Sequence, residues 1–302
     1  MSQPAPALYM KYENIRSLLH PLKAIVFNDK AKICYAVIIA SARGLRITVE
    51  HGKSAQAVAY LESKGCDQYV MAGNEVEFAV DILAIIRFLE TGIFPSSSNS
   101  FNAGPIGSAS LRFSYDPDQE KPLEIHLECP TFATRLAMKT IGHWDLQMED
   151  VLDQTTSSFL AKVILKCDAL KEAFVDLDLS SEFLSLSTSS DPAYLRFSTS
   201  SRLSSSLVDF NAGSATGNNV IVQYFHCRES ATFKYRMSLF RASLRAMVFG
   251  RRVSLRVRSD GILALQFQMP SMSSGMDDEF DENCFTYVDY IFRAIEDESL
   301  LH

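Results

Sequence analysis

The sequence predicts an α+β fold made of two similar domains, each with two helices packed on antiparallel sheets. Three observations support this fold class. The chain has 302 residues, which is enough for two cores of ordinary size. Apolar stripes with helical spacing recur at a nearly constant interval, and short segments rich in β-branched and aromatic residues fill the rest. Antiparallel hairpins are the simplest way to join so many short strands.

The first helix is predicted close to the N-terminus. Ile15, Leu18, Leu19 and Leu22 fall at positions i, i+3, i+4 and i+7, which is the apolar stripe of an amphipathic helix. Pro21 lies inside this stripe. Because proline has no amide hydrogen to donate, we expect it to kink or shorten the helix.

Strands and a second helix complete the first half. Five strand-like segments come first, at residues 31–39, 45–50, 55–61, 68–72 and 76–80. The second helix is expected to begin at an Asp81 cap, to continue through residues 82–90 and to stop at Gly92. Three further strands are predicted at residues 109–115, 123–129 and 132–138.

The second half repeats this order. Leu170, Ala173, Phe174 and Leu177 form another helical stripe, and each lies 155 residues after its counterpart, as 170 − 15 shows. Residues 235–240 match residues 78–83 at an interval of 157, with Ser238 in the place of Asp81. This fourth helix should end at Gly250, before strands at residues 253–258, 262–270 and 284–292. Two anchors at nearly one interval indicate an internal duplication.

The duplication divides the chain into four parts. We predict an N-terminal domain at residues 1–141, a connector at 142–156, a C-terminal domain at 157–295 and an acidic tail at 296–302. The connector has neither helical nor strand periodicity, and it mixes acidic with apolar residues. Such a segment is expected to lie over the protein surface.

Charge is distributed unevenly along the chain. The net charge of −7 argues against binding nucleic acid through overall charge. However, residues 234–258 contain eight basic residues and no acidic one, whereas residues 273–302 contain nine acidic residues and one arginine. Any contact with DNA must therefore be local.

Cysteines and apolar runs indicate an intracellular protein without cofactors. The six cysteines are scattered without the spacing of metal ligands, so we expect free thiols, no metal and no cofactor. Residues 1–7 lack the layout of a secretory signal, and no apolar run reaches the roughly 20 residues of a membrane span.

The order of these elements resembles the processivity-clamp family over nearly the whole chain. Several local stretches are similar to one branch of that family, the Rad-one subunits of the heterotrimeric nine-one-one checkpoint ring. These stretches are residues 22–27, 44–50, 55–61, 170–174, 261–267 and 284–288. The segments 35–43 and 272–283 depart from the expected pattern, and both are expected in connections between elements.

The resemblance implies a non-catalytic subunit of a nuclear DNA sliding clamp. Such a subunit would form a ring with two paralogous subunits, and an ATP-dependent clamp loader would open the ring onto double-stranded DNA. The ring would recruit checkpoint and repair proteins at sites of damage. No membrane contact is expected.

Clamp rings line their bore with helices, so the resemblance directs attention to basic residues opposite the apolar stripes. These candidate DNA-facing residues are Arg16, Lys23, Arg87, Lys171, Arg241 and Arg245. His20 lies between the first two, at spacing i+4 from Arg16. They could contact phosphates without reading bases. The alternative is that they are solvated charges with no ligand.

Two further surfaces follow from the resemblance. In this family a partner peptide docks beneath the connector, and its apolar residues here are Leu146, Met148, Val151 and Leu152. Each of them could equally well pin the connector to its domain. One strand edge from each domain pairs with a neighbouring subunit, which assigns subunit contacts to the edges at 132–138 and 203–210. The interface residues chosen on these edges are Phe132, Leu136, Leu203 and Leu207.

Two other functions remain as alternatives. Asp176, Asp178 and Glu182 could suggest a 3′-to-5′ DNA exonuclease, but no second acidic cluster completes a two-metal site. The other alternative is a homotrimeric replication clamp, which would need no paralogous partner.

Overall fold

The computed structural model describes residues 6–93, 109–129, 132–142, 158–212, 220–272 and 280–295. The chain divides into two compact units. Unit 1 comprises Met1–Val49, Val58–Met148 and Pro270–Tyr287, and unit 2 comprises Glu50–Ala57, Glu149–Met269 and Val288–His302. The sequence-based limits at residues 141 and 157 stay a prediction, because a contact-based division does not test which segments fold independently.

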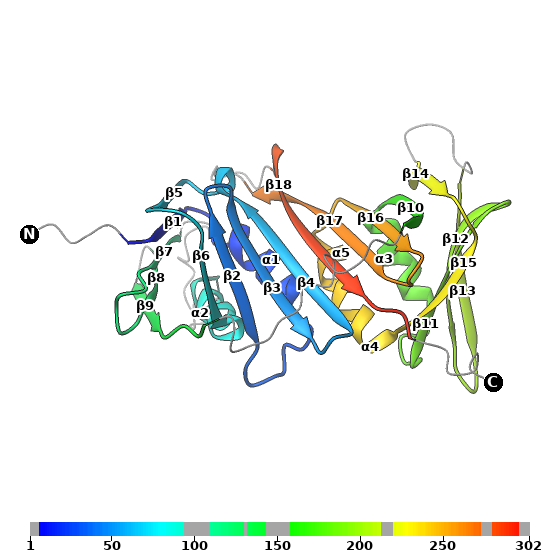
Figure 1. Ribbon diagram of the computed structural model, residues 1–302, viewed down its shortest axis with the longest axis horizontal. Helices are drawn as coiled ribbons and strands as arrows, with labels where there is room; N and C mark the ends of the chain where they lie inside the picture. Colours follow the sequence, from blue (N-terminus) through cyan, green and yellow to red (C-terminus); the bar gives the residue numbers. More distant parts are fainter. Residues whose placement is uncertain are drawn as a thin grey trace, which may run out of the picture. The chain divides into compact units, whose positions relative to one another are not determined.

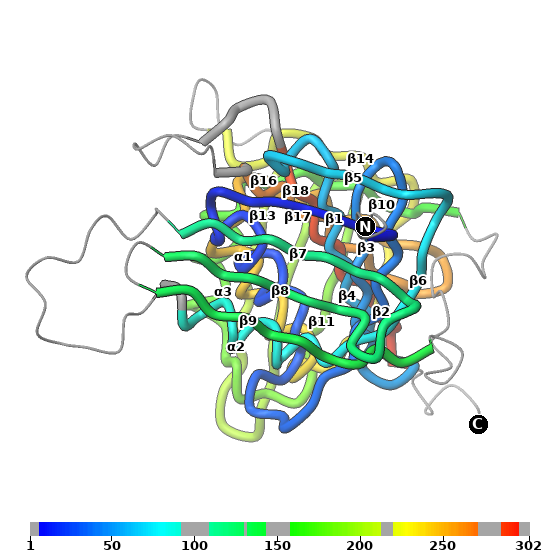
Figure 2. Tube along the Cα trace, turned by 90° about the vertical axis from the view of Figure 1, so that its left-hand side faces the viewer, coloured from blue at the N-terminus to red at the C-terminus, as the bar shows by residue number. Residues whose placement is uncertain are grey.

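Unit 1 contains two antiparallel runs of strands (Figure 1). The first is a sheet with the order β5-β1-β7-β8-β9, whose last four members are seen side by side in Figure 2. Its strands are β1 (Leu8–Tyr12), β5 (Gln68–Met71), β7 (Ser110–Tyr115), β8 (Leu123–Glu128) and β9 (Ala133–Met138). The second run has the order β4-β3-β2-β6. It comprises β2 (Tyr35–Ser41), β3 (Gly44–His51), β4 (Ala55–Glu62) and β6 (Val76–Asp81), and a 3₁₀ turn (Ser63–Gly65) follows β4.

Helices α1 (Arg16–Ile25) and α2 (Ile82–Ile93) pack against each other in unit 1. The predicted stripe of α1 is confirmed, because Ile15, Leu18, Leu19 and Leu22 are all buried. The expectation that Pro21 shortens this helix is wrong. The helix continues to Ile25, and Pro21 is buried, so the apolar area removed from water offsets the one missing amide bond.

The predicted Asp81 cap of α2 is confirmed. Its carboxylate Oδ1 accepts hydrogen bonds from the amides of Leu83 at 3.2 Å and Cys34 at 3.0 Å. The expected stop at Gly92 is wrong, because α2 includes Gly92 and ends at Ile93. One glycine costs a helix only about 1 kcal/mol, which packing can offset.

Unit 2 contains the remaining strands, also antiparallel. One sheet run has the order β14-β10-β16-β17-β18 and the other has the order β13-β12-β11-β15. The first comprises β10 (Phe159–Lys166), β14 (Val222–Cys227), β16 (Arg252–Arg258), β17 (Leu263–Met272) and β18 (Phe280–Phe292). Residues 270–272 of β17 and 280–287 of β18 fall within the limits of unit 1. The second comprises β11 (Phe183–Ser190), β12 (Ala193–Ser200), β13 (Ser205–Asn211) and β15 (Ala231–Arg236).

Two helical regions accompany these strands. Helix α3 (Cys167–Asp176) carries the buried Leu170, Ala173 and Phe174, with the buried Leu177 just after it. The predicted fourth helix is interrupted, because α4 (Met237–Phe240) and α5 (Leu244–Phe249) are joined by a 3₁₀ turn. Ser238 does not cap it, since the helix already begins at Met237 and its cap position is Arg236.

Aromatic rings form the centre of unit 2. The ring of Phe240 stacks on Phe174, with 5.0 Å between centroids, and on Phe292, at 5.3 Å. Tyr290 stacks on Phe292 and donates its hydroxyl hydrogen to the carbonyl oxygen of Ala242 at 3.1 Å. These side chains are fully or almost fully buried. They fix the α4–α5 region to the sheet that contains β18.

Candidate nucleic-acid interface and partner surfaces

Helix α1 brings Arg16, His20 and Lys23 together in unit 1. All three side chains are half-buried, on the side of α1 opposite the apolar stripe. The ammonium of Lys23 lies 2.8 Å from the Glu90 carboxylate of α2. Lys23 is therefore already paired within the protein. This pairing reduces the positive charge that Lys23 offers to DNA.

His20 responds to this cationic surface. The pKa of its imidazole is lowered from 6.5 to about 4. Partial burial is the main cause, and the nearby charges of Arg16 and Lys23 add to it. A protonated His20 ring would lie beside two other positive charges, so the neutral imidazole is favoured at neutral pH. His20 thus adds hydrogen-bonding capacity and no charge to this surface.

This shift predicts a pH-dependent stability. Because the pKa of His20 is lower in the folded chain, the unfolded chain binds more protons between pH 6.5 and about 4. The free energy of unfolding should fall as the pH decreases through that window, by about 1–2 kcal/mol after allowing for solvent screening. Chemical denaturation of His20→Gln should show a smaller loss than the wild type. The exposed His51→Gln serves as the control, and equal losses in all three proteins would contradict the prediction.

Arg87 is the basic residue predicted on α2, and it is exposed. Its guanidinium Nη2 donates a hydrogen bond to the carbonyl oxygen of Ala31 at 3.1 Å. Only part of its donor set is used in this way, because a guanidinium has five N–H groups. The remaining N–H groups of this exposed side chain could donate to a ligand.

The other three candidates lie in unit 2. Lys171 is exposed on α3, Arg241 is exposed in the 3₁₀ turn, and Arg245 is half-buried on α5. Helices α3 and α5 contact each other, so these cations belong to neighbouring helical segments. The charge of Arg245 also acts on the phenol of Tyr290, whose pKa is nevertheless raised by burial.

Strands β9 and β13 are each the last strand of their sheet. On β9, Leu136 is half-buried, and Phe132 lies just before the strand with similar exposure. Near β13, Leu203 is 98% exposed and Leu207 is 59% exposed. Two large apolar side chains on an edge are suited to contact another protein, since an unpaired edge can also accept a strand.

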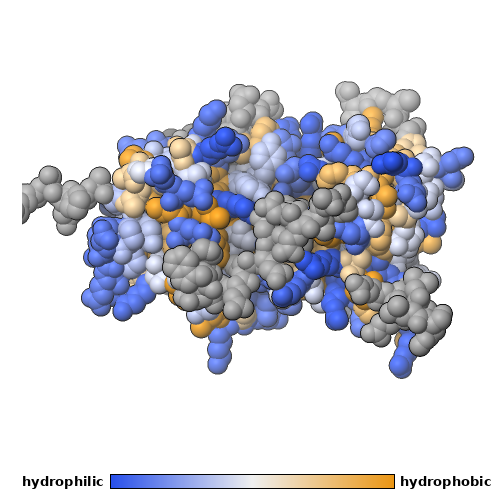
Figure 3. Space-filling model, viewed as in Figure 1, coloured by the Kyte–Doolittle hydropathy of each residue, from blue (hydrophilic) through white to orange (hydrophobic). Residues whose placement is uncertain are grey.

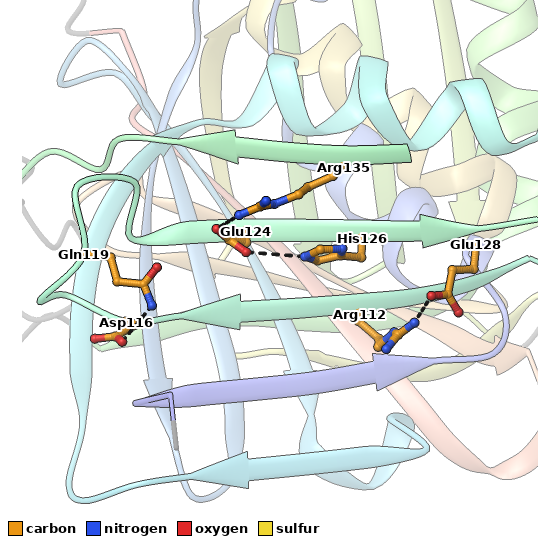
Figure 4. Close-up of polar contacts among 7 residues, drawn as sticks. All are labelled: Arg112, Asp116, Gln119, Glu124, His126, Glu128 and Arg135. Atoms are coloured by element: carbon orange, nitrogen blue, oxygen red, sulfur yellow. Dashed lines mark hydrogen bonds and ion pairs between the residues drawn. The ribbon is translucent and has the colours of Figure 1, made fainter. Parts of the chain in front are cut away.

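The β9 edge carries a charge network on one face (Figure 4). The carboxylate of Glu124 on β8 contacts the Arg135 guanidinium of β9 and lies 3.4 Å from the His126 ring. Burial alone would raise the pKa of Glu124, but Arg135 and His126 lower it overall. Arg112 of β7 contacts Glu128 in the same way. These ion pairs join side chains of adjacent strands, β7 with β8 and β8 with β9, and they partly neutralise the charges on this face.

The predicted partner-peptide residues Leu146, Met148, Val151 and Leu152 lie outside the described residues. Their role stays a prediction. Five cysteines are free thiols, namely Cys34, Cys66, Cys129, Cys167 and Cys227. Burial raises the pKa of the Cys167 thiol to about 12, so it is un-ionised at neutral pH.

Asp178, one of the three acidic residues considered for a nuclease, is engaged in local hydrogen bonds. The Asp178 carboxylate accepts hydrogen bonds from the amide and hydroxyl of Ser180, at 2.9 and 2.6 Å, and from the hydroxyl of Ser204. Those bonds lower its pKa and fix the turn after α3. Within the described ranges, no group of three or more His, Cys, Asp or Glu side chains could hold a metal ion.

Sequence reasoning missed one cluster of cations in unit 2. Lys162 and Lys166 alternate with buried residues along β10, and Arg252 and Arg256 do the same along β16. The alternation of basic and apolar residues in each segment was a usable signal. Which cations face each other depends on strand register, which the sequence does not reveal.

Comparisons with known proteins agree over most of the chain. The family model described as "Repair protein Rad1/Rec1/Rad17" matches residues 7–269. The human "Cell cycle checkpoint protein RAD1" is 29% identical over 265 residues, which cover 87% of this chain and 86% of that protein. The "DNA repair protein Rad1" of Drosophila melanogaster is 24% identical over 263 residues, 86% of each chain. The "DNA damage checkpoint control protein rad1" of Schizosaccharomyces pombe is 24% identical over 284 residues, 89% of this chain and 81% of that one. In the part of the chain with described structure, no helix is long and apolar enough to cross a membrane.

Proposed function

The chain belongs to the repair protein Rad1/Rec1/Rad17 family, and from this premise we propose that it is one subunit of a heterotrimeric ring that encircles DNA. The subunit acts at DNA damage in the nucleus and recruits checkpoint and repair proteins without catalysing a reaction itself. Its two partners are paralogous clamp subunits, and an ATP-dependent loader opens the ring. The names of its relatives, which include checkpoint and DNA repair proteins, support this role.

The observation that carries the proposal is a repeated topology. One strand, one helix, five strands, a second helical region and three strands follow each other from β1 to β9, and again from β10 to β18. The sheet orders also match, because β5-β1-β7-β8-β9 corresponds to β14-β10-β16-β17-β18, and β4-β3-β2-β6 corresponds to β13-β12-β11-β15. Such agreement in order and pairing supports the duplicated clamp fold.

The start of the second helix in each half refines the interval of the duplication. Helix α2 begins at Ile82 and α4 begins at Met237, which gives 237 − 82 = 155 residues. The value of 157 inferred from sequence at this point was two residues too long, because it matched Ser238 to the Asp81 cap. The starts of the first helices, Arg16 of α1 and Cys167 of α3, are 167 − 16 = 151 residues apart. The two intervals differ by four residues, and this near agreement favours duplication over coincidence.

Weak contacts with DNA suffice for this function. A closed ring stays on DNA because the double helix passes through it, so a few screened phosphate contacts can guide sliding. The exposed Lys171, Arg241 and Arg87 suit this task. Lys23 contributes less because it is paired with Glu90. This arrangement is compatible with the net charge of −7.

The proposal is tested by measuring subunit assembly and the effect of substitutions at the β13 edge. Mixing the chain with its two paralogous subunits should give a one-to-one-to-one complex by light scattering, and this complex should stay on a closed circular plasmid and leave a linear one. Leu203→Asp with Leu207→Asp should weaken the complex by about tenfold or more, because each carboxylate would lose its water at the interface. The melting temperature of the isolated chain should change little, since both leucines are exposed.

A matched variant isolates the effect of the edge. Ile33→Asp also places a carboxylate at a 56%-exposed apolar position, but in a loop of unit 1 that belongs to neither predicted interface edge, and it should assemble like the wild type. A trimer formed by the chain alone would indicate the homotrimeric clamp instead. Failure to form any complex with the paralogues would refute the proposal.

A further inference from the structure

One face of the β14-β10-β16 region in unit 2 carries four cations. On β10 the side chains of Val163 and Leu165 are buried, whereas Lys162 and Lys166 alternate with them on the other face. On β16 the buried side chains likewise alternate with Arg252 and Arg256. We call Lys162, Lys166, Arg252 and Arg256 the cationic face. Hydrophilic residues on the visible surface of the molecule are drawn in blue in Figure 3.

Strand register arranges these cations as two facing pairs. Lys162 lies opposite Arg256, and Lys166 lies opposite Arg252. Directly opposed residues have Cβ atoms about 5 Å apart, so like charges there reduce stability. The two pairs are separated by four residues, which is roughly 13 Å along a strand. This arrangement works against folding, and a bound anion at each pair would relieve the repulsion.

Two cations of the cationic face, Lys162 and Arg252, receive little negative charge from the described residues. Among the described residues, neither Lys162 nor Arg252 forms an ion pair with a carboxylate. The described polar partner of Arg256 is the Oε1 atom of Gln266 at 3.2 Å, whose Nε2 in turn donates to Asp289 at 3.3 Å. The side-chain amide of Gln266 thus links Arg256 to the carboxylate of Asp289.

Apolar side chains lie beside the cations. Ile164 is half-buried midway between Lys162 and Lys166 on β10. Tyr224 on β14 lies opposite Ile164 and is 46% exposed. The ammonium of Lys162 lies 5.6 Å from the centroid of the Tyr224 ring. Aromatic residues and arginine are enriched where proteins bind other proteins.

We propose that the cationic face binds an extended acidic peptide of a partner protein. Two carboxylates four residues apart in such a peptide would span the roughly 13 Å between the pairs, and each would meet one lysine and one arginine. The side chain midway between them would point to the same face and contact Ile164 and Tyr224. A nucleic-acid backbone fits less well, because its charge is continuous and would place phosphate over Ile164.

The test uses the full chain and a short fluorescent peptide. The peptide carries two glutamates four residues apart with a leucine midway between them, and binding is measured by fluorescence anisotropy at low and high salt. Lys162→Gln with Arg256→Gln, and separately Lys166→Gln with Arg252→Gln, should each weaken binding by about tenfold. Replacing the glutamates of the peptide by glutamine should have a similar effect.

Two controls separate recognition from bulk charge and from misfolding. Lys64→Gln with Lys121→Gln removes two exposed cations of unit 1 and should leave peptide binding unchanged. Lys162→Gln with Arg256→Gln removes a like-charge contact, but also the contact of Lys162 with Tyr224 and the hydrogen bond from Arg256 to Gln266. These effects oppose each other, so the melting temperature should stay within about 3 °C of the wild type. A larger fall would attribute weak peptide binding by this variant to misfolding, and Lys166→Gln with Arg252→Gln would then decide.

Several outcomes would overturn the proposal. One is equal peptide binding by the wild type and both double variants. Another is that a peptide whose glutamates are two residues apart binds as tightly as the original peptide. That result would show that the spacing of four residues has no role in recognition. Tighter binding of a polythymidine strand, lost in the same variants, would reassign the cationic face to nucleic acid. None of these measurements requires the ring, so they stand apart from the test of the proposed function.

Discussion

Replacing Phe240 by alanine should lower the free energy of unfolding by about 3–5 kcal/mol, the usual cost of removing a buried aromatic side chain. The ring of Phe240 is fully buried, and it stacks on both Phe174 and Phe292. Alanine would leave a cavity between α3, α4 and β18 that rigid neighbours cannot fill. Urea denaturation followed by circular dichroism would measure the loss.

The matched control for this prediction is Phe159→Ala. Phe159 begins β10 and is 53% exposed, so its loss should change the free energy of unfolding by less than about 1 kcal/mol. Equal losses in the two variants would mean that the Phe174, Phe240 and Phe292 cluster does not stabilise unit 2. A folded but loosely packed Phe240→Ala protein would appear as a lower dependence on denaturant.

Replacing Gly44 by alanine should destabilise unit 1 by about 3 kcal/mol or more, because two penalties combine. Gly44 begins β3 after the tight turn from β2, and its φ of +134° is rarely adopted by residues with a side chain. A Cβ atom there would also overlap the carbonyl oxygen of Leu61. The backbone amide of Ser63 bonds to the carbonyl of Arg43 at 2.9 Å, so the chain cannot easily move away.

Gly73→Ala isolates the backbone penalty. Gly73 also has a positive φ, of +105°, but a Cβ atom there would meet nothing within 4 Å. This variant should lose only about 1–2 kcal/mol. Thermal melting of both variants would compare them, and similar losses would show that the contact with Leu61 has no role.

Much of the fold could be predicted from local patterns. The apolar stripes of α1 and α3 are buried as expected, and the Asp81 cap and the Gly250 end of the fourth helical region are in their predicted places. These features depend on residues within a few positions of each other, so local spacing is sufficient. The resemblance to the checkpoint branch of clamps is confirmed by the family match over residues 7–269.

The errors arose where tertiary packing outweighs local preference. Pro21 and Gly92 lie inside helices because burial elsewhere compensates for one lost bond or one flexible residue. The cap predicted at Ser238 from its match with Asp81 is wrong, because β15 ends two residues earlier and the helix begins before the serine.

The candidate site also combines features that local spacing predicts with features that only tertiary contacts decide. Arg16, Lys23 and Lys171 could be placed on helices from spacing, but the pairing of Lys23 with Glu90 joins residues from two helices. Lys162 and Arg256 face each other across strands that are far apart in the sequence. Side-chain partners of this kind follow from register and helix packing, which no local window contains.

The sequence by itself determined the α+β class, the helical stripes, the uneven charge and the family, because each is written in residue type and spacing. Only the tertiary structure decided which cations are neutralised, which strands are edges and which like charges are opposed. The physical reason is that electrostatic and edge contacts act over a few ångströms in space, between residues that can be about ninety positions apart in the chain, as Lys162 and Arg256 are.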